Sequence, residues 1–384
     1  MKPKSSILVF LSFIIISSLF CFNYFRNNEI NLDAIFYTGC AIKLENNDIR
    51  EVHNRTFNYL KEYLPHQKFD SLFDESNYKK LLPENVESFA QQLDFYKSRL
   101  FYISLIYLII KAGINPFYGG LFLSTIFVMA GLSIILYGFK IHEKIYLFIV
   151  SLIISLVLGT GYICNLVTPD SLIFLFICLI LYLLLKQSYT SLLYMLIVLL
   201  IIKLSMFIFV FQMIFLIFIL DRKGLINISL IHIVTVTVLS FIIIIFYFFY
   251  INEYSWDTLF YHTFINYLSY PYNFTEKISI SQYTIVLFRN FSAISHSKPF
   301  LIFIAFCIYN ISPFRKETNF VIMKYMNIIN LIFVIIHFLL FPNISERFFV
   351  GIYFSTFVIF LFNLDVPGNN FLRNQTTYVL PNRE

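Results

Sequence analysis

Long apolar runs separated by short polar connections make up most of this 384-residue chain. A run of about 20 apolar residues crosses the hydrocarbon core of a bilayer as a helix. We therefore predict an all-α polytopic bundle of about ten to eleven transmembrane spans. Strong candidates cover 5–24, 117–139, 145–163, 170–186, 226–250, 318–341 and 346–364, and shorter ones cover 190–202, 205–220 and 299–312.

One long polar segment, residues 25–99, interrupts this pattern after the first span. We divide a single domain, 1–384, into a first span (5–24), an extracytoplasmic loop with juxtamembrane helices (25–99), a helix bundle (100–364) and a cytoplasmic tail (365–384). The run 5–24 follows Lys2 and Lys4 and lacks a small-residue cleavage site, which favours an uncleaved anchor over a signal peptide.

The pattern of the polar loop predicts helices rather than a β domain. Asp33 to Leu44 has an amphipathic pattern, Asp48 to Leu64 stops before Pro65, and Pro83 is expected to open a helix through Gln92. Helices with apolar faces and charged backs are expected to lie along the membrane surface.

The apolar segment 99–113 is short, and whether it crosses the membrane is open. Positive charge concentrates in the cytoplasmic loops of membrane proteins. If 99–113 does not cross and both 190–202 and 205–220 do, the basic residues between spans collect on the cytoplasmic side, namely Lys140, Lys144, Lys186, Arg222, Lys223, Arg315 and Lys316. This arrangement favours ten crossings with both termini inside.

Composition supports a membrane protein and excludes several other classes. Apolar residues make up 59% and charged residues 13%, about half the charged share of soluble domains. The five cysteines are scattered, without disulfide or metal-type spacing. A net charge of +6 suits positive cytoplasmic loops, so no nucleic-acid partner is implied. We expect a bacterial inner (plasma) membrane protein with membrane lipid as a partner; the sequence does not indicate its oligomeric state.

Asp33 is the first acidic residue after the anchor and has two interpretations. An Asp before a new helix commonly caps free backbone N–H groups. A carboxylate at the depth of the lipid headgroups is also suited to act as a catalytic base.

Two cations, Lys97 and Arg99, lie where the loop returns to the apolar region. They are either snorkelling cations of an interfacial aromatic belt or ligands of a lipid phosphate, which a guanidinium binds bidentately.

Charged residues also stand at the ends of spans. Asp170 follows Thr168 and Pro169, which is ordinary punctuation at a helix start, although an acid at a span mouth is a site candidate. Lys203 lies between two apolar runs, where a charge usually faces a cavity or partner. Glu346 and Arg347 open the last span and either pair with each other or join the site. No soluble-enzyme motif or metal-ligand spacing is present.

These features together resemble the GT-C superfamily of membrane glycosyltransferases, in a poorly characterised bacterial branch. The residues that carry the resemblance are Asp33 with Tyr37, the stretch Gln92 to Tyr102, Thr168-Pro169-Asp170, Lys203 and Glu346-Arg347. The branch pattern has proline where this chain has Asp94 and Leu100. A single early acid also differs from the paired acids of metal-dependent relatives, so no metal and no cofactor are implied.

The resemblance implies transfer of a sugar, a hexose or a pentose, from a polyprenyl-phosphate donor to an extracytoplasmic glycan or lipid acceptor. Asp33 would be the catalytic base of an inverting reaction. Substrate or lipid phosphate would be bound by the remaining candidates, Tyr37, Lys97, Arg99, Asp170, Lys203, Glu346 and Arg347. The lipid-linked sugar would be a co-substrate.

Two other functions fit a polytopic chain. A lipid or polysaccharide transporter or flippase would carry charges at mid-bilayer and inverted repeats, and no repeat is evident here. An integral-membrane polysaccharide polymerase has many spans but usually a large loop late in the chain.

Overall fold

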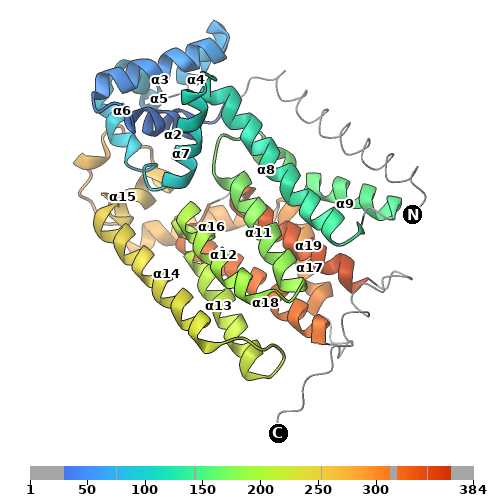
Figure 1. Ribbon diagram of the computed structural model, residues 1–384. Helices are drawn as coiled ribbons and strands as arrows, with labels where there is room; N and C mark the ends of the chain where they lie inside the picture. Colours follow the sequence, from blue (N-terminus) through green and yellow to red (C-terminus); the bar gives the residue numbers. More distant parts are fainter. Residues whose placement is uncertain are drawn as a thin grey trace.

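The computed structural model describes residues 30–364 except 75, 142–143, 252, 312–317 and 344, and gives only the backbone of 318–320. The expected first span 5–24 and tail 365–384 lie outside these residues. The described chain is helical and has no strand, which confirms the all-α polytopic bundle. A cap of short helices sits on one end of a bundle of longer helices (Figure 1). We call this end of the molecule the loop side.

The cap contains five helices, α2 to α6, in the first polar segment. They are α2 (Leu32–Lys43), α3 (Ile49–Tyr63), α4 (His66–Asp74), α5 (Asn77–Glu84) and α6 (Val86–Leu93). Helix α3 confirms the predicted segment before Pro65 and is capped by Asp48, whose side chain accepts a hydrogen bond from the backbone N–H of Arg50 at 2.9 Å.

Two expectations for the cap were wrong. Pro83 lies in the last turn of α5, and α6 begins after Asn85, whose side chain accepts from the Ser88 N–H at 2.9 Å. Helix α2 is buried on all sides from Ala34 to Ile42, where an amphipathic helix with one exposed face was expected. It packs against α3, α6 and the bundle helices α7 (Leu100–Lys111) and α8 (Pro116–Gly138), so it is the core of the cap.

The bundle continues with α9 to α14. They are α9 (Ile145–Val157), α10 (Thr160–Cys164), α11 (Asp170–Leu185), α12 (Tyr189–Ile202), α13 (Phe207–Arg222) and α14 (Leu230–Tyr250). The predicted span 145–163 is interrupted at Gly159, whose φ of +102° is a left-handed conformation that ends α9.

The rest of the chain forms α15 (Trp256–Phe260), α16 (Ile280–Ser295), α17 (Lys298–Ile311), α18 (Thr318–Leu340) and α19 (Val350–Asn363). A π-helical turn covers Tyr261–Ile265, and 3-10 turns cover Leu204–Met206, Pro271–Asn273 and Glu346–Phe348.

Four helices within the described residues have the length and apolar character of membrane spans: Pro116–Gly138, Leu204–Arg222, Leu230–Tyr250 and Val321–Leu340. The pair α16 and α17 would add a fifth if it is one span. Five apolar helices of 10–17 residues, α7, α9, α11, α12 and α19, are shorter. The chain is therefore an integral membrane protein, and within the described residues the helices of full spanning length are fewer than the ten or eleven spans expected of the whole chain.

Helix α7 forms most of segment 99–113, for which the sequence left open whether it crosses the membrane. Its twelve residues rise only about 18 Å at 1.5 Å per residue, against a hydrocarbon core of about 30 Å. It packs between α2 of the cap and α8 and α12 of the bundle. This segment therefore joins the cap to the bundle and is too short to cross upright.

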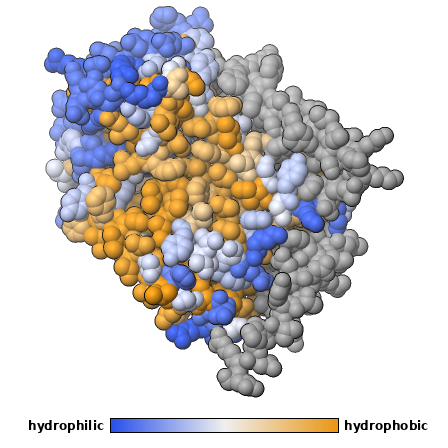
Figure 2. Space-filling model, viewed as in Figure 1, coloured by the Kyte–Doolittle hydropathy of each residue, from blue (hydrophilic) through white to orange (hydrophobic). Residues whose placement is uncertain are grey.

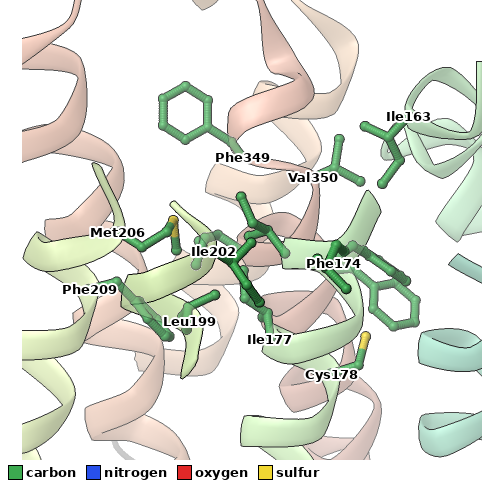
Figure 3. Close-up of a cluster of buried hydrophobic side chains, with 14 of the residues drawn as sticks. Ile163, Phe174, Ile177, Cys178, Leu199, Ile202, Met206, Phe209, Phe349 and Val350 are labelled. Carbon is green, nitrogen blue, oxygen red and sulfur yellow. The ribbon is translucent and has the colours of Figure 1, made fainter. Parts of the chain in front are cut away.

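The apolar core of the bundle lies between α11, α12, α13 and α19, where Phe174, Ile177, Leu199 and Phe209 gather beside Val350 (Figure 3). Glycines allow this packing. A Cβ on Gly351 would come within 2.7 Å of Ile177, and one on Gly131 within 2.8 Å of Phe174. Small residues are the usual means by which membrane helices approach closely.

The outer surface matches a bilayer. Hydrophilic residues cover the cap, and below it apolar residues cover the visible face of the bundle (Figure 2). Helix α14 is the most exposed span, with only 17% of its apolar window buried. Its side chains point to where lipid would lie.

Candidate functional site

Asp33 lies in the first turn of α2 but does not cap it. The N-cap residue is Asn31, whose side-chain oxygen instead accepts a hydrogen bond from the Val167 N–H at 3.2 Å. The Asp33 carboxylate accepts a hydrogen bond from the Tyr96 hydroxyl at 2.7 Å through Oδ1, and its Oδ2 lies 2.6 Å from Nη1 of Arg347. The capping interpretation is therefore replaced by an ion pair with the far end of the chain.

Asp170 is the first residue of α11 and is buried in a second ion pair. Its Oδ1 accepts a hydrogen bond from Nζ of Lys203 at 2.7 Å, and its Oδ2 accepts one from the Thr168 hydroxyl at 2.9 Å. The two charged side chains are only 4% and 9% exposed. An acid at a helix N-terminus also suits the helix dipole.

Lys203 reaches Asp170 because the chain breaks there. It is the C-cap of α12 in an extended conformation, and the 3-10 turn Leu204–Met206 follows before α13. Its ammonium lies 4.1 Å from the centre of the Phe348 ring, a cation–π contact that lowers the cost of burying a charge. The expectation that Lys203 faces a partner rather than solvent is confirmed.

Arg347 connects the two ion pairs. It lies in the turn Glu346–Phe348 before α19, and its Nε is 3.7 Å from Oδ2 of Asp170 while Nη1 pairs with Asp33. Its guanidinium carbon is 5.0 Å from the centre of the Phe348 ring. We call Asp33, Asp170, Lys203 and Arg347 the charge cluster. Arg347 thus pairs with distant carboxylates rather than with its neighbour Glu346.

Tyr96 and Arg99 flank the charge cluster. The Tyr96 ring stacks on Phe36 at 4.8 Å and meets the edge of Tyr37 at 5.2 Å, and the Arg99 guanidinium lies 5.6 Å from its centre. Burial, and then the charge of Asp33, raises the pKa of Tyr96 well above its ordinary value. The Tyr96 phenol therefore stays protonated and donates a hydrogen bond to Asp33.

Tyr37 lies beside the charge cluster rather than in it. Its ring meets the edges of Tyr96 at 5.2 Å and Tyr102 at 5.1 Å. Burial raises the pKa of the Tyr37 phenol, while the positive charge of Arg99 acts in the opposite direction. Tyr37 therefore packs on Tyr96 next to the charge cluster, and the Arg99 guanidinium donates a hydrogen bond to the Phe95 carbonyl.

Lys97 points elsewhere, although it is only one residue from Tyr96. It pairs with Asp94 at 3.2 Å and with Glu253, and the Tyr272 hydroxyl hydrogen-bonds to both carboxylates. Burial lowers the pKa of Lys97, but the hydrogen bond with Glu253 and the charge of Asp94 raise it overall. The phosphate-binding role expected of Lys97 has no support, since its charge is used to hold two loops together.

The structure thus joins four of the eight predicted site residues directly, with Tyr37 and Arg99 adjacent and with Lys97 and Glu346 apart. The side chains of the charge cluster contact one another directly, through the ion pairs described above. Tyr96, Thr168 and Phe348 also contact the charge cluster, although none was proposed as a site residue. Tyr96 and Thr168 belong to stretches that carried the resemblance, and Phe348 follows Arg347, but only pairing across the fold identifies their contacts.

Charge in the site is slightly positive. Two carboxylates face Lys203 and Arg347, and Arg99 adds a third cation next to Tyr96. Among the described residues no group of three or more His, Cys, Asp or Glu side chains is arranged to hold a metal ion. A site with one surplus cation is suited to an anionic group such as a phosphate.

Comparison of the chain with protein-family models, with curated proteins and with solved structures finds no match.

Proposed function

We propose that the protein is a membrane glycosyltransferase that moves a sugar from a polyprenyl-phosphate donor to an acceptor outside the cytoplasm. The observation that carries this proposal is the position of Asp33. Its carboxylate lies at the junction of cap and bundle and is held by Tyr96 and by Arg347, which also approaches the pair formed by Asp170 and Lys203.

Asp33 would act as the base. It would take the proton of the acceptor hydroxyl as that oxygen forms a bond to the anomeric carbon of the sugar. The bond from that carbon to the phosphate oxygen would break, with its electron pair leaving on the polyprenyl phosphate. Attack opposite the leaving group inverts the configuration of the sugar.

The leaving phosphate would be stabilised by the cations of the site. Arg347 and Arg99 offer guanidinium groups, which suit phosphate geometry, and Lys203 adds an ammonium. Positioned cations that meet charge as it develops supply much of the stabilisation in phosphate-leaving reactions. Asp170 would orient Lys203 and Arg347 instead of binding a sugar hydroxyl, because its two oxygens are already occupied.

The free site would have to rearrange before reaction. Both oxygens of Asp33 are engaged, by Tyr96 and by Arg347. A phosphate that draws the Arg347 guanidinium to itself would release one oxygen of Asp33 to accept a proton. Donor binding and activation of the base would thereby be linked through one side chain.

A purified sample in lipid nanodiscs tests the proposal with a radiolabelled polyprenyl-phosphate sugar and a polyprenyl-linked oligosaccharide acceptor. Asp33→Asn should reduce transfer by about 10²- to 10⁴-fold, the usual contribution of a general base. Asp48→Asn is the matched control because Asp48 is an exposed cap in the same loop. Glycan analysis of a deletion strain would identify the sugar and the acceptor.

Transfer that persists in Asp33→Asn, with the variant folded, would contradict the proposal. Movement of the labelled lipid between leaflets without transfer, tolerant of Asp33→Asn, would instead identify a flippase.

A further inference from the structure

Helix α16 lies across the direction of the bundle. It meets α17 at an angle of 80° after a break of only two residues. Helix α17 packs against α18 and α19, and the side chain of Asn310 hydrogen-bonds to Asn327 of α18 and to the Thr356 carbonyl of α19. Since α17 is built into the bundle, α16 turns sharply away from the direction of a bundle helix.

Three separate faces run along α16. Because each residue turns the helix by about 100°, the buried residues at intervals of four, Val286, Asn290 and Ile294, share one face against the protein. A second face carries the exposed apolar side chains of Ile280, Phe288 and Phe291. A third face, next to it, carries the exposed polar side chains of Ser281, Gln282, Arg289 and Ser292, with the apolar Ile285 among them.

Hydrogen bonds fasten α16 to the segment that leads to the charge cluster. The Tyr283 hydroxyl donates to the carbonyl of Leu339, and the Asn290 amide donates to the carbonyl of Pro342. On its other flank Arg289 donates to the Phe264 carbonyl at 2.7 Å. Since Pro342 precedes Arg347 by only five residues, α16 lies near the level of the charge cluster on the loop side.

We propose that α16 is an interfacial helix whose exposed apolar face rests in the lipid headgroup layer on the loop side. A helix with one protein face, one apolar face and one polar face matches the boundary between lipid and water. The proposal does not depend on sugar transfer. It places the end of α18 and Arg347 at headgroup depth, where the anionic phosphate of a lipid is found.

Lipid is the occupant that the surrounding surface favours. Phe288 is 69% exposed, and α17, the next helix, also has exposed apolar side chains at Leu301 and Ile308. The span α14 likewise leaves most of its apolar side chains exposed. Exposed apolar side chains on all three helices are covered when lipid surrounds the protein.

Spin labels in nanodiscs test the orientation. Ser281→Cys and Ser292→Cys lie on the same polar face eleven residues apart, in a variant with Cys21 replaced by serine; the other four cysteines are buried. An interfacial helix predicts that both labels are accessible to a water-soluble relaxation agent. Phe288→Cys should be accessible to oxygen at shallow depth.

A crossing helix gives a different result. It would separate Ser281 and Ser292 by about 16 Å of depth at 1.5 Å per residue. Labels at Val234 and Phe248 of α14 calibrate this gradient, since α14 is a candidate span with both side chains exposed. A label at Ser292 as deep as one at Phe241 would overturn the proposal.

The same labels identify the occupant. A mobile Phe288→Cys label that collides with oxygen supports lipid. Dipolar broadening between labels at this position in a sample of several copies would show a second copy on the face and would contradict lipid as the occupant.

Discussion

At the scale of residues, the central feature is a guanidinium next to two carboxylates. Arg347 pairs with Asp33 at 2.6 Å and approaches Asp170 at 3.7 Å. A planar fork with several donors can serve two acceptors at fixed angles, whereas a lysine ammonium on the same backbone acts as a single point charge. Arginine at this position thus joins the cap to the bundle as well as adding charge.

The buried pair of Asp170 and Lys203 leads to a prediction about stability. Removing one partner leaves a buried charge uncompensated, which costs about 3–5 kcal/mol. Asp170→Asn should therefore lower the free energy of unfolding by about that amount, measured by thermal or denaturant unfolding in detergent. The double variant Asp170→Leu with Lys203→Met should recover most of the loss, because neither member of the pair then remains charged and Arg347 keeps its ion pair with Asp33.

The exposed pair of Lys111 and Glu45 provides the comparison. These groups are 47% and 35% exposed, so solvent screens their interaction, and Lys111→Met should change stability little. A double variant at Asp170 and Lys203 that is no more stable than the single one would show that the pair does not act as a unit.

At the scale of elements, close helix packing positions the charge cluster. A Cβ on Gly120 of α8 would come within 2.5 Å of Val167. Val167 stands three residues before Asp170, and its N–H donates to Asn31 near Asp33. The absence of a side chain on α8 thereby sets the distance between two helix starts that carry the carboxylates.

Gly120→Ala should therefore disturb the site as well as the fold. The branched side chain of Val167 is stiff, so the segment must move, at a cost of about 1–3 kcal/mol for overpacking. We expect lower unfolding stability and reduced transfer. Phe122→Ala is the control on the same helix, because that side chain is 58% exposed. Full transfer in Gly120→Ala would show that the spacing of these helices is not critical.

The sequence predicted the positions of helices better than the contacts between them. Apolar runs located α8, α14 and α18 because burial in lipid leaves a long signal, and charges in apolar surroundings identified Asp170 and Lys203. Nothing local indicates that Arg347 pairs with Asp33 instead of Glu346, or that Tyr96 faces the site while Lys97 turns away. The amphipathic pattern expected of α2 was also wrong, because α3, α6, α7 and α8 together cover it on every side.

At the scale of the whole molecule, two loops far apart in the chain form one cap. The segment 253–279 is fastened to α6 by hydrogen bonds from Ser88 to the Ser269 carbonyl and from Gln92 to the Leu268 carbonyl, both at 2.8 Å. His262 supports this segment from within, because its Nδ1 accepts the Leu268 N–H at 3.0 Å. The cap therefore depends on an unprotonated imidazole.

Acid should loosen this cap. Burial lowers the pKa of His262 to about 4, with Asp33 acting in the opposite direction. Because the opened segment takes up a proton near the ordinary pKa of about 6.5, stability is complete above that pH and is lost as the pH falls from about 6.5 toward 4. At pH 5 the open fraction should be about 25-fold higher than at pH 7.5.

Hydrogen exchange, expressed as protection factors for residues 253–279, measures this effect. His262→Asn retains an acceptor for the Leu268 N–H and should remove the pH dependence, whereas His296→Asn, at an exposed position, should leave it. Equal protection at pH 5 and pH 7.5 in the wild-type protein would show that His262 does not support the cap.

The residues of the charge cluster lie far apart in the sequence, and this separation has a consequence for biosynthesis. Asp170 and Lys203 can pair as soon as α12 has entered the membrane, but the partner of Asp33 is Arg347, which is translated long after all three. Until Arg347 is made, Asp33 must therefore remain without its cation. A chain truncated before Arg347 would lack the cation that pairs with Asp33, so its cap would not be joined to the bundle by this ion pair, and cellular proteases would distinguish it from the finished protein.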